Sequence, residues 1–285
     1  MTAQQTLVIY GNCQAEFIHM ILRLCPSLSS RFNLILIGSA LPLSESTEPL
    51  LQHSETAVLL WEQYNQRDQI LLREEIRSRV PTNCFAVRFP AVGLNTLWPL
   101  RTKDPRNTPE AGFPWGRYPI GDHVAMNVAR LGLRPNEALK QYHRISRERM
   151  PNLQKLLQLE RAFFKQRDAA CDIAMEDFVF SNLTTTRQFW TYGHLDSYVV
   201  RHLLSKLIEA SKPVLGPVTS ETRTELTDAC ANHPGQGNVQ LPIHPTVIER
   251  LDLSFVSESS TYRYFGNEWT FDDYITHYMR LSRDW

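Results

Sequence analysis

Four consecutive residues near the start of the chain, Gly11-Asn12-Cys13-Gln14, have side chains and a position suited to chemistry. They follow the apolar segment Leu7–Tyr10, which is typical of a short buried strand, and from Gln14 the apolar residues recur at helical intervals. Gly11 allows the chain to turn through backbone angles that a side chain would resist. The free N–H groups and the dipole of a helix N-terminus favour negative charge, including a cysteine thiolate. The segment therefore predicts a reactive or anion-binding corner.

Each of these residues also has a purely structural interpretation. Free cysteine is among the most buried residue types, so Cys13 could be a small buried side chain in a tight turn. Asn12 is a favoured N-cap residue, and Asn12 and Gln14 could serve only to cap the helix. The residues alone leave both interpretations open.

A histidine in the second half of the chain is the strongest candidate for a general base. His194 precedes a helix predicted from Ser197, and Asp196 stands between them. A loop histidine in this position could reach a cleft, with Asp196 as an orienting partner, or could satisfy local backbone groups. His123 and His244 are weaker candidates, because a chain with nine histidines has some in loops by chance.

Composition and charge exclude several classes of protein. At 285 residues, with 42% hydrophobic content, the chain is long enough to bury a large core. Its 30 basic and 30 acidic residues balance, so charge gives no argument for binding nucleic acid or a membrane surface. No apolar run approaches the roughly 18 residues of a membrane span, and the first residues do not resemble a secretory signal. We therefore expect a cytoplasmic protein with no membrane span and no nucleic-acid partner.

The cysteines and the familiar motifs narrow the chemistry further. The five cysteines form no CxxC or other metal-type pair, and their odd number fits reduced thiols better than a disulfide framework. The sequence contains no GxGxxG, GxxxxGKS/T, HExxH or GxSxG motif. Nucleotide hydrolysis, hydride transfer and zinc chemistry therefore lose support, and no metal is expected.

The first 90 or so residues alternate between predicted strands and predicted helices. The expected strands are Leu7–Tyr10, Phe32–Gly38, Ala57–Trp61 and Cys84–Phe89, and the expected helices are Gln14–Leu24, Glu48–Gln52 and Asp68–Val80. Such alternation predicts an α/β fold with a central, Rossmann-like parallel sheet flanked by helices on both faces. Ligands in that architecture bind beyond the carboxyl ends of the strands. The Gly11–Gln14 corner and the stretches after Trp61 and Phe89 would converge there.

The rest of the chain is predicted to be mainly helical. Phe89–Pro119 is rich in Pro, Gly and Trp and predicts an ordered substrate loop, with a flexible linker as the alternative. Helices are expected over Gly121–Leu131, Pro135–Arg147, Pro151–Arg167, Ala174–Leu183, Ser197–Ala210, Val247–Leu251 and Trp269–Leu281. We expect one α/β domain over 1–285, with a βαβ core in 1–95, a loop and helices over the cleft in 96–150, and a helical half completing the site in 151–285.

Two parts of the sequence carry a resemblance to a known family. Tyr10-Gly11-Asn12-Cys13-Gln14 after a first strand, and the block from Phe189 to His194, resemble the WcbI-type polysaccharide biosynthesis proteins, acetyltransferases of bacterial capsule assembly. The family's second block usually reads Asn-His-Pro at its end. Here Gly193 and Leu195 replace the Asn and the Pro, so only His194 carries over.

The resemblance implies a fold distantly like the SGNH esterases, with coenzyme A bound in the cleft. It implies Cys13 as nucleophile, His194 as base, Asp196 as orienting residue, and Gly11, Asn12 and Gln14 as oxyanion or substrate-binding groups. The cations available near the strand ends for the phosphates of coenzyme A are Arg88, Arg101, Lys103 and Arg117.

We therefore expect an acyltransferase that moves an acyl group, such as acetyl from acetyl-CoA, to a sugar or polysaccharide precursor. One alternative is an SGNH-type esterase or deacetylase with Cys13 as nucleophile. Another is a non-catalytic module that binds coenzyme A or a sugar phosphate. Acetyl-CoA consumption with and without a sugar acceptor separates the first two, and binding that survives Cys13→Ala without any turnover indicates the third.

Overall fold

The computed structural model describes residues 4–39, 48–52, 56–63, 74–233 and 235–281. The chain divides into two compact units. The first unit comprises Met1–Gly93, Arg161–Asn182 and Gly193–Gly237, and the second comprises Leu94–Glu160, Leu183–Tyr192 and Asn238–Trp285. The first unit thus holds the predicted βαβ core together with parts of the predicted helical half, and a single domain over 1–285 stays a prediction.

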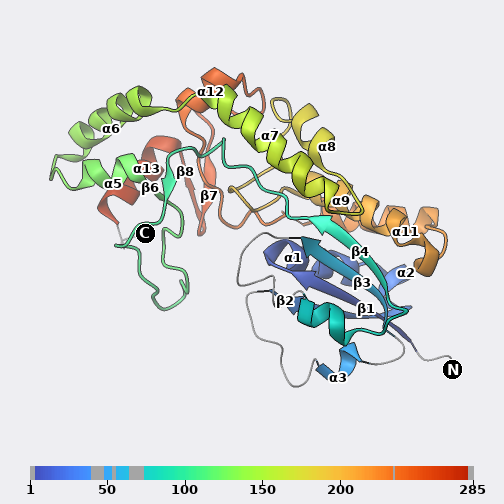
Figure 1. Ribbon diagram of the computed structural model, residues 1–285. Coiled ribbons are helices and arrows are strands. Elements are labelled where there is room, and N and C mark those ends of the chain that lie inside the picture. Colours follow the sequence, from blue (N-terminus) through green and yellow to red (C-terminus); the bar gives the residue numbers. More distant parts are fainter. Residues whose placement is uncertain (1–3, 40–47, 53–55, 64–73, 234, 282–285) are drawn as a thin grey trace. The chain divides into compact units, whose positions relative to one another are not determined.

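A parallel sheet forms the centre of the first unit (Figure 1). Its strands are β1 (Gln5–Gly11), β2 (Phe32–Gly38), β3 (Thr56–Gln63) and β4 (Phe85–Pro90), in the order β2-β1-β3-β4. Tyr10 of β1 pairs in parallel with Ile37 of β2 and with Trp61 of β3, and β4 pairs with β3 in the same sense. The predicted α/β fold with a central parallel sheet is confirmed.

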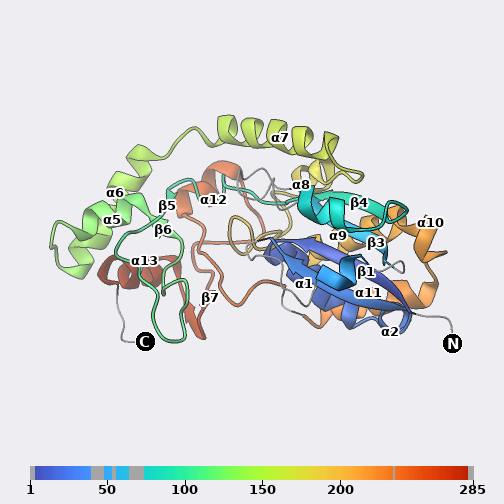
Figure 2. The same cartoon turned by 60° about the horizontal axis from the view of Figure 1, so that its bottom comes forward.

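Helices pack on both faces of this sheet. The helices of the unit are α1 (Cys13–Arg23), α2 (Pro26–Ser29), α3 (Glu48–Leu51), a helical stretch at 74–79, α8 (Glu176–Ser181), α9 (Ser197–Ala210), α10 (Lys212–Leu215) and α11 (Ser220–Ala231). Side chains of a strand alternate between faces. Leu7 lies on the face where Leu22 of α1 and Leu204 of α9 pack, whereas Val8 lies in the cluster that includes Leu51 of α3. Figures 1 and 2 show α9 beside α11, and these two helices are in contact.

The helices predicted for the first unit are present where the structure describes them, and three further helices were not predicted. The first part of the predicted Asp68–Val80 helix lies outside the described residues, and 74–79 is helical. The short helices α2 and α10 and the longer α11 were not expected. In α11 only Thr222, Leu226 and Cys230 are buried, so its apolar signal is weak.

The second unit combines helices with two small antiparallel pairs of strands. Its elements are β5 (Arg101–Thr102), β6 (Gly121–Asp122), α5 (His123–Ala129), α6 (Pro135–Arg149), α12 (Pro245–Leu251), β7 (Tyr262–Tyr264), β8 (Asn267–Trp269) and α13 (Phe271–Arg280), and α7 (Leu153–Ala169) contributes residues to both units. A cluster of packed tyrosines forms part of its core: Tyr118, Tyr264, Tyr274 and Tyr278. The predicted Phe89–Pro119 loop is mostly irregular and ordered by turns, and its role in substrate binding stays a prediction.

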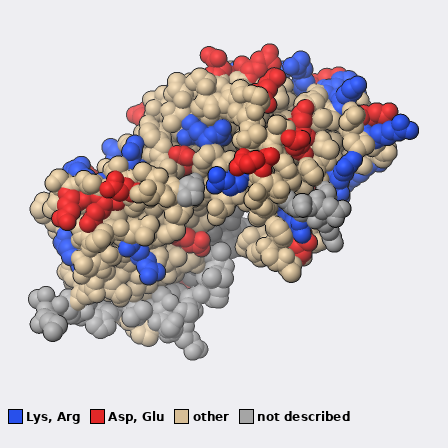
Figure 3. All heavy atoms as spheres, turned by 180° about the vertical axis from the view of Figure 1, so that it is seen from behind, with Lys and Arg blue, Asp and Glu red and all other residues tan. Residues whose placement is uncertain are grey.

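The distribution of surface charge and the lengths of the helices bear on the possible partners of the protein. Basic and acidic side chains are interspersed on the face seen in Figure 3. Within the described part of the chain, none of the helices combines the length and the apolarity needed to cross a membrane.

Candidate functional site

The order of the strands singles out one place on the sheet. Along β2-β1-β3-β4 the connection from β1 runs first to one side and then, from β2 to β3, to the other. In open parallel sheets ligands bind at the carboxyl ends of the strands at such a reversal, here between β1 and β3. Gly11 ends β1, Glu62 and Gln63 end β3, and α1 starts at Cys13. The predicted Gly11–Gln14 corner therefore lies at the topological switch point.

Asn12 is the N-cap of α1, as its structural interpretation proposed. Its side-chain Oδ1 accepts a hydrogen bond from the backbone N–H of Gln14 at 2.8 Å. Its own backbone N–H donates to Oε2 of Glu62 at 2.6 Å. Both contacts fix the peptide that leads into Cys13.

Gly11 is required for a different reason from the one predicted. It is not among the residues with positive φ, so no unusual turn demands a glycine here. Instead, a Cβ atom on Gly11 would lie 2.1 Å from Oε2 of Glu62 and 2.9 Å from the Cβ of Ala15. The glycine admits the carboxyl group of β3 against the end of β1.

Glu62 is the main site residue that sequence reasoning missed. Its side chain is 1% exposed, and burial raises its pKa to about 8, although the hydrogen bonds from Asn12 act in the opposite direction. Oε1 is buried and has no hydrogen-bond partner among the described residues. The available signal was a single acidic residue directly after the apolar run Ala57–Trp61, at a predicted strand end.

The side chain of Gln14 connects the start of α1 to two distant segments. It is 4% exposed, its Nε2 donates to the carbonyl oxygens of Val92 and of Gly193 (3.0 Å for the latter), and its Oε1 accepts from the N–H of Val92 at 3.0 Å. Both polar atoms of the Gln14 amide are therefore engaged in hydrogen bonds. Gln14 therefore holds the residue before His194 against the start of α1.

Gln236 makes a second connection to the same segment, and it was not anticipated. Its Nε2 donates to the carbonyl oxygen of Cys13 at 2.9 Å, and its Oε1 accepts from the N–H of Leu195 at 3.0 Å. Gly235 before it has φ +66°, and a Cβ there would lie 2.8 Å from the carbonyl oxygen of Leu195. We call Gln14 and Gln236 the glutamine clamp.

The glutamine clamp places His194 beside the Cys13 corner, because its two chain neighbours are both tied to residues 13 and 14. His194 is half-buried, and burial lowers its pKa, so the imidazole is neutral near pH 7. Asp196 caps α9 by accepting the N–H of Tyr198 at 2.8 Å. The structure thus brings together the segments that carry Cys13, His194 and Asp196 within the first unit.

A helix N-terminus favours a thiolate and so predicts a lowered pKa for Cys13, and this prediction is wrong. The side chain is half-buried, and burial raises the pKa of its thiol, with the charges of Glu62 and Glu16 acting in the same direction. The side chain of Gln236 opposes this by hydrogen bonding. At this site the desolvation of the thiol outweighs the hydrogen bonds that favour the thiolate.

The four predicted phosphate-binding cations are not gathered in one unit. Arg88 lies in the first unit and is paired with Asp172, with its Nη2 at 2.9 Å from Oδ1. The other three lie in the second unit: Arg101 bonds to Asn95 and lies over the ring of Tyr192, Arg117 pairs with Glu110, and Lys103 is exposed. Two of the four therefore already have carboxylate partners.

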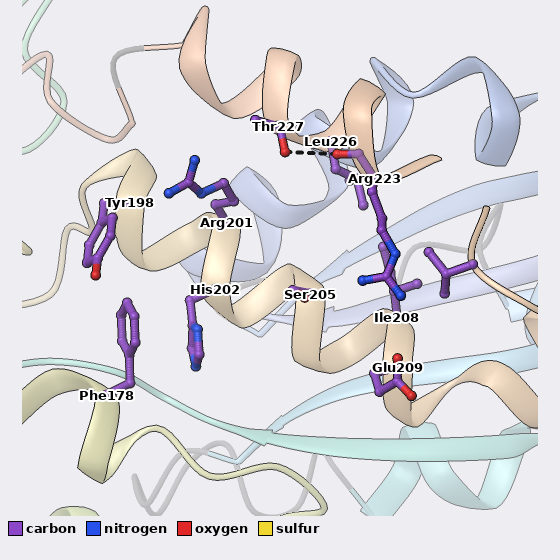
Figure 4. A pocket seen from close by; sticks show the side chains of 11 residues that line it. Phe178, Tyr198, Arg201, His202, Ser205, Ile208, Glu209, Arg223, Leu226 and Thr227 are labelled. Atoms are coloured by element: carbon purple, nitrogen blue, oxygen red, sulfur yellow. Dashed lines mark hydrogen bonds between the residues drawn. The ribbon is translucent and has the colours of Figure 1, made fainter. Parts of the chain in front are cut away.

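The first unit offers two other arginines at a cavity of about 450 Å³ between α9 and α11 (Figure 4). Arg201 and Arg223 line it, and neither forms an ion pair among the described residues. Figure 4 shows the rings of Phe178, Tyr198 and His202 gathered at one end, where the Phe178 and His202 rings stack with centroids 3.7 Å apart. The cavity has cations and apolar walls that suit an anionic organic ligand, and the carboxylate of Glu209 also lines it.

The weaker histidine candidates have structural roles in the second unit. His244 caps α12 by accepting the N–H of Thr246 on Nδ1 at 3.0 Å, and its Nε2 is 2.9 Å from Oγ of Ser146. Burial lowers its pKa to about 3, so it stays neutral. His123 contacts the carbonyl oxygen of Leu100 through Nδ1 at 2.9 Å. Among the described residues, no three His, Cys, Asp or Glu side chains come together as a metal site requires.

Comparisons with known proteins agree with this architecture. Residues 6–213 match the profile of a family described as "Polysaccharide biosynthesis enzyme WcbI". A solved structure described as WcbI, a novel polysaccharide biosynthesis enzyme, in a native form without a disulfide bond between coenzyme A and a cysteine, superposes with a TM-score of 0.73 at 15% sequence identity. The match covers 98% of this chain and 91% of that chain, and at this identity it shows the fold alone. A comparison with curated proteins found no match. Because the family profile spans most of the chain, this protein belongs to the WcbI family of polysaccharide biosynthesis enzymes.

Proposed function

We propose that this protein transfers an acyl group from coenzyme A to a sugar or polysaccharide precursor at the Cys13 corner. The glutamine clamp carries the proposal, since it ties the residues on both sides of His194 to residues 13 and 14 at the switch point of the sheet. The family description supports a role in polysaccharide biosynthesis, and the description of the related structure names coenzyme A next to a cysteine.

Cys13 and His194 would share the proton transfers of such a reaction. Cys13 gives its proton to the neutral imidazole of His194 while its sulfur bonds to the acyl carbon and the bond to the departing thiol breaks. His194 returns the proton to that thiol. An acceptor hydroxyl then loses its proton to His194 as its oxygen bonds to the acyl carbon, the bond to Cys13 breaks, and the cysteine recovers a proton.

The oxyanion donors differ from those first expected. The N–H of Asn12 is engaged by Glu62, the N–H of Gln14 is engaged by Asn12, and the Gln14 amide is used by the clamp. The remaining first-turn N–H groups are those of Cys13 and Ala15, and the N–H of Cys13 also faces the thiol of its own residue. We assign these two N–H groups to the developing oxyanion. Gln14 is then a positioning residue.

The cavity between α9 and α11 is suited to the phosphates of the acyl donor. Tyr198 at its aromatic end follows His194 by four residues, which span at most about 14 Å even when fully extended. A flexible donor whose thioester lies at Cys13 could therefore reach Arg201 and Arg223. The predicted cations Arg88 and Arg117 would first have to leave their carboxylate partners.

The direct test measures acetyl-CoA consumption with a panel of sugar nucleotides, with transfer detected by the mass of the acetylated acceptor. Turnover that needs an acceptor and disappears in Cys13→Ala supports the proposal. Turnover that continues without any acceptor would instead indicate the esterase.

The raised pKa of Cys13 favours a second candidate, a non-catalytic module that binds coenzyme A. A thiol that stays protonated at neutral pH can contact a ligand without attacking it. Isothermal titration of coenzyme A into Cys13→Ala separates the two. Unchanged affinity together with no turnover in the wild-type protein would support the binding module.

A further inference from the structure

One of the two carboxyl oxygens of Glu62 has no hydrogen-bond partner among the described residues. Oε2 accepts the N–H of Asn12 at 2.6 Å, whereas Oε1 is buried with no partner among the described residues. No lysine or arginine in the described part of the chain forms an ion pair with this carboxyl group. A buried carboxylate without a counter-charge is costly, so the group is held as a neutral acid.

The position of Glu62 brings this acid to the end of β1. Gly11 has no side chain to keep it away, since any Cβ there would collide with Oε2. The next residues along the chain are Asn12, which bonds to Glu62, and Cys13, whose thiol feels the charge of Glu62. The carboxyl group and the thiol are therefore electrostatically coupled at the switch point.

We propose that Glu62 is a positioning residue that controls the Cys13 thiol: as a neutral acid it orients the Asn12–Cys13 peptide and allows a thiolate to form, and as a carboxylate it keeps the thiol protonated. Two anions in one buried corner repel each other, so the pair holds its protons jointly. Such a pair titrates as a unit. Burial is the main cause of the raised pKa of Cys13, and the charge of Glu62 raises it further.

Other side chains close to Glu62 and Cys13 have smaller or neutral effects on the thiol. Glu16 on α1 is exposed and adds a weaker repulsion to the Cys13 thiol. The 193–196 segment carries two titratable groups: His194, whose pKa is lowered by burial alone, and Asp196, which caps α9. Gln236 contributes a neutral hydrogen bond. Glu62 is therefore the dominant charge acting on the thiol.

The test compares alkylation of Cys13 by iodoacetamide in the wild-type protein and in Glu62→Gln, followed by mass spectrometry from pH 6 to pH 10. Glutamine keeps an oxygen for the N–H of Asn12 and cannot ionise. We expect alkylation about tenfold faster than wild type at pH 9, the effect of lowering the thiol pKa by about one unit, and a small difference at pH 6. The matched control is Glu16→Gln, which removes an exposed charge from the same helix and should change the rate by less than about twofold.

Equal rates in Glu62→Gln and wild type at every pH would overturn the proposal, and so would a slower rate in the variant. The wild-type protein also provides an independent readout if the variant folds poorly. Carbon-13 NMR of labelled glutamates should show one carboxyl group that titrates near pH 8. Titration of every glutamate below about pH 6 would equally overturn it. The effect of Glu62 on acyl transfer rests on the proposed function. Alkylation of Cys13 requires no turnover, so the proposal about Glu62 and the proposed function can fail separately.

Discussion

Replacing Glu62 by glutamine should change how the stability of the protein depends on pH. Burial raises the folded-state pKa of Glu62 to about 8, from an ordinary value of 4.5. A group with a raised pKa contributes stability that is fully present below its unfolded pKa and is lost as the pH rises through its folded pKa. The wild-type protein therefore loses stability from this residue between pH 4.5 and pH 8.

The magnitude follows from the two pKa values. At about 1.36 kcal/mol per pKa unit, ionisation of Glu62 in the unfolded chain costs the folded state roughly 0.8 kcal/mol at pH 5 and roughly 5 kcal/mol at pH 9. Glutamine at this position does not ionise. The difference in free energy of unfolding between Glu62→Gln and wild type should therefore shift in favour of the variant by about 4 kcal/mol from pH 5 to pH 9.

Urea unfolding at pH 5, 7 and 9 measures this difference, because the other titrating groups except Cys13, whose thiol is coupled to Glu62, are shared and cancel between the two proteins. The linear extrapolation gives the free energy in water, and the slope m checks that both proteins expose the same surface. Parallel pH profiles for variant and wild type would refute the argument that Glu62 is buried without a counter-charge.

Three further changes test the site. His194→Ala should lower turnover by about 10²–10⁴-fold while coenzyme A binding, measured by calorimetry, is largely retained; unchanged turnover would leave His194 a structural residue. The double variant Arg201→Ala/Arg223→Ala should weaken coenzyme A binding at least about tenfold, and an unaltered Kd would remove the cavity from the donor site. Gly11→Ala should destabilise the protein by about 3 kcal/mol or more in urea, since the new Cβ would lie 2.1 Å from the buried carboxyl oxygen. The control Gly38→Ala, where no atom lies within 4 Å, should stay within about 1 kcal/mol of wild type.

The sheet was predictable because its signals are local. Each strand is a short apolar run bounded by turn residues, and each crossover carries a helical period that the chain displays by itself. The predicted Phe32–Gly38 strand is reproduced at both ends by β2, and Ser197–Ala210 by α9. The hairpin of β7 and β8 was missed because each of its strands has only three residues, which is too short to establish an alternating pattern.

The polar contacts of the site depend on long-range packing and were only partly predictable. The corner and His194 were found from their positions in the chain, but Gln236 stands in a segment rich in Gly, Asn and Pro where nothing marks one glutamine. It acts only because the fold brings it to Cys13, 223 residues away. The direction of the Cys13 pKa was wrong for a related reason, since the helix N-terminus is visible in the sequence and the burial is not.

A raised thiol pKa changes what the proposed chemistry requires of its neighbours. Each unit added to the pKa of Cys13 lowers the thiolate fraction about tenfold at neutral pH, and the greater nucleophilicity of a more basic thiolate restores only about threefold of it. A preformed thiolate is therefore a poor explanation for reactivity at this corner. The thiol needs a neighbour that takes its proton as the new bond forms, and that neighbour must be neutral beforehand. His194 meets the second condition because burial lowers its pKa, and the glutamine clamp addresses the first by tying the histidine's segment to the cysteine. The two glutamines therefore contribute to the proposed reaction by positioning His194, as the helix contributes by positioning Cys13.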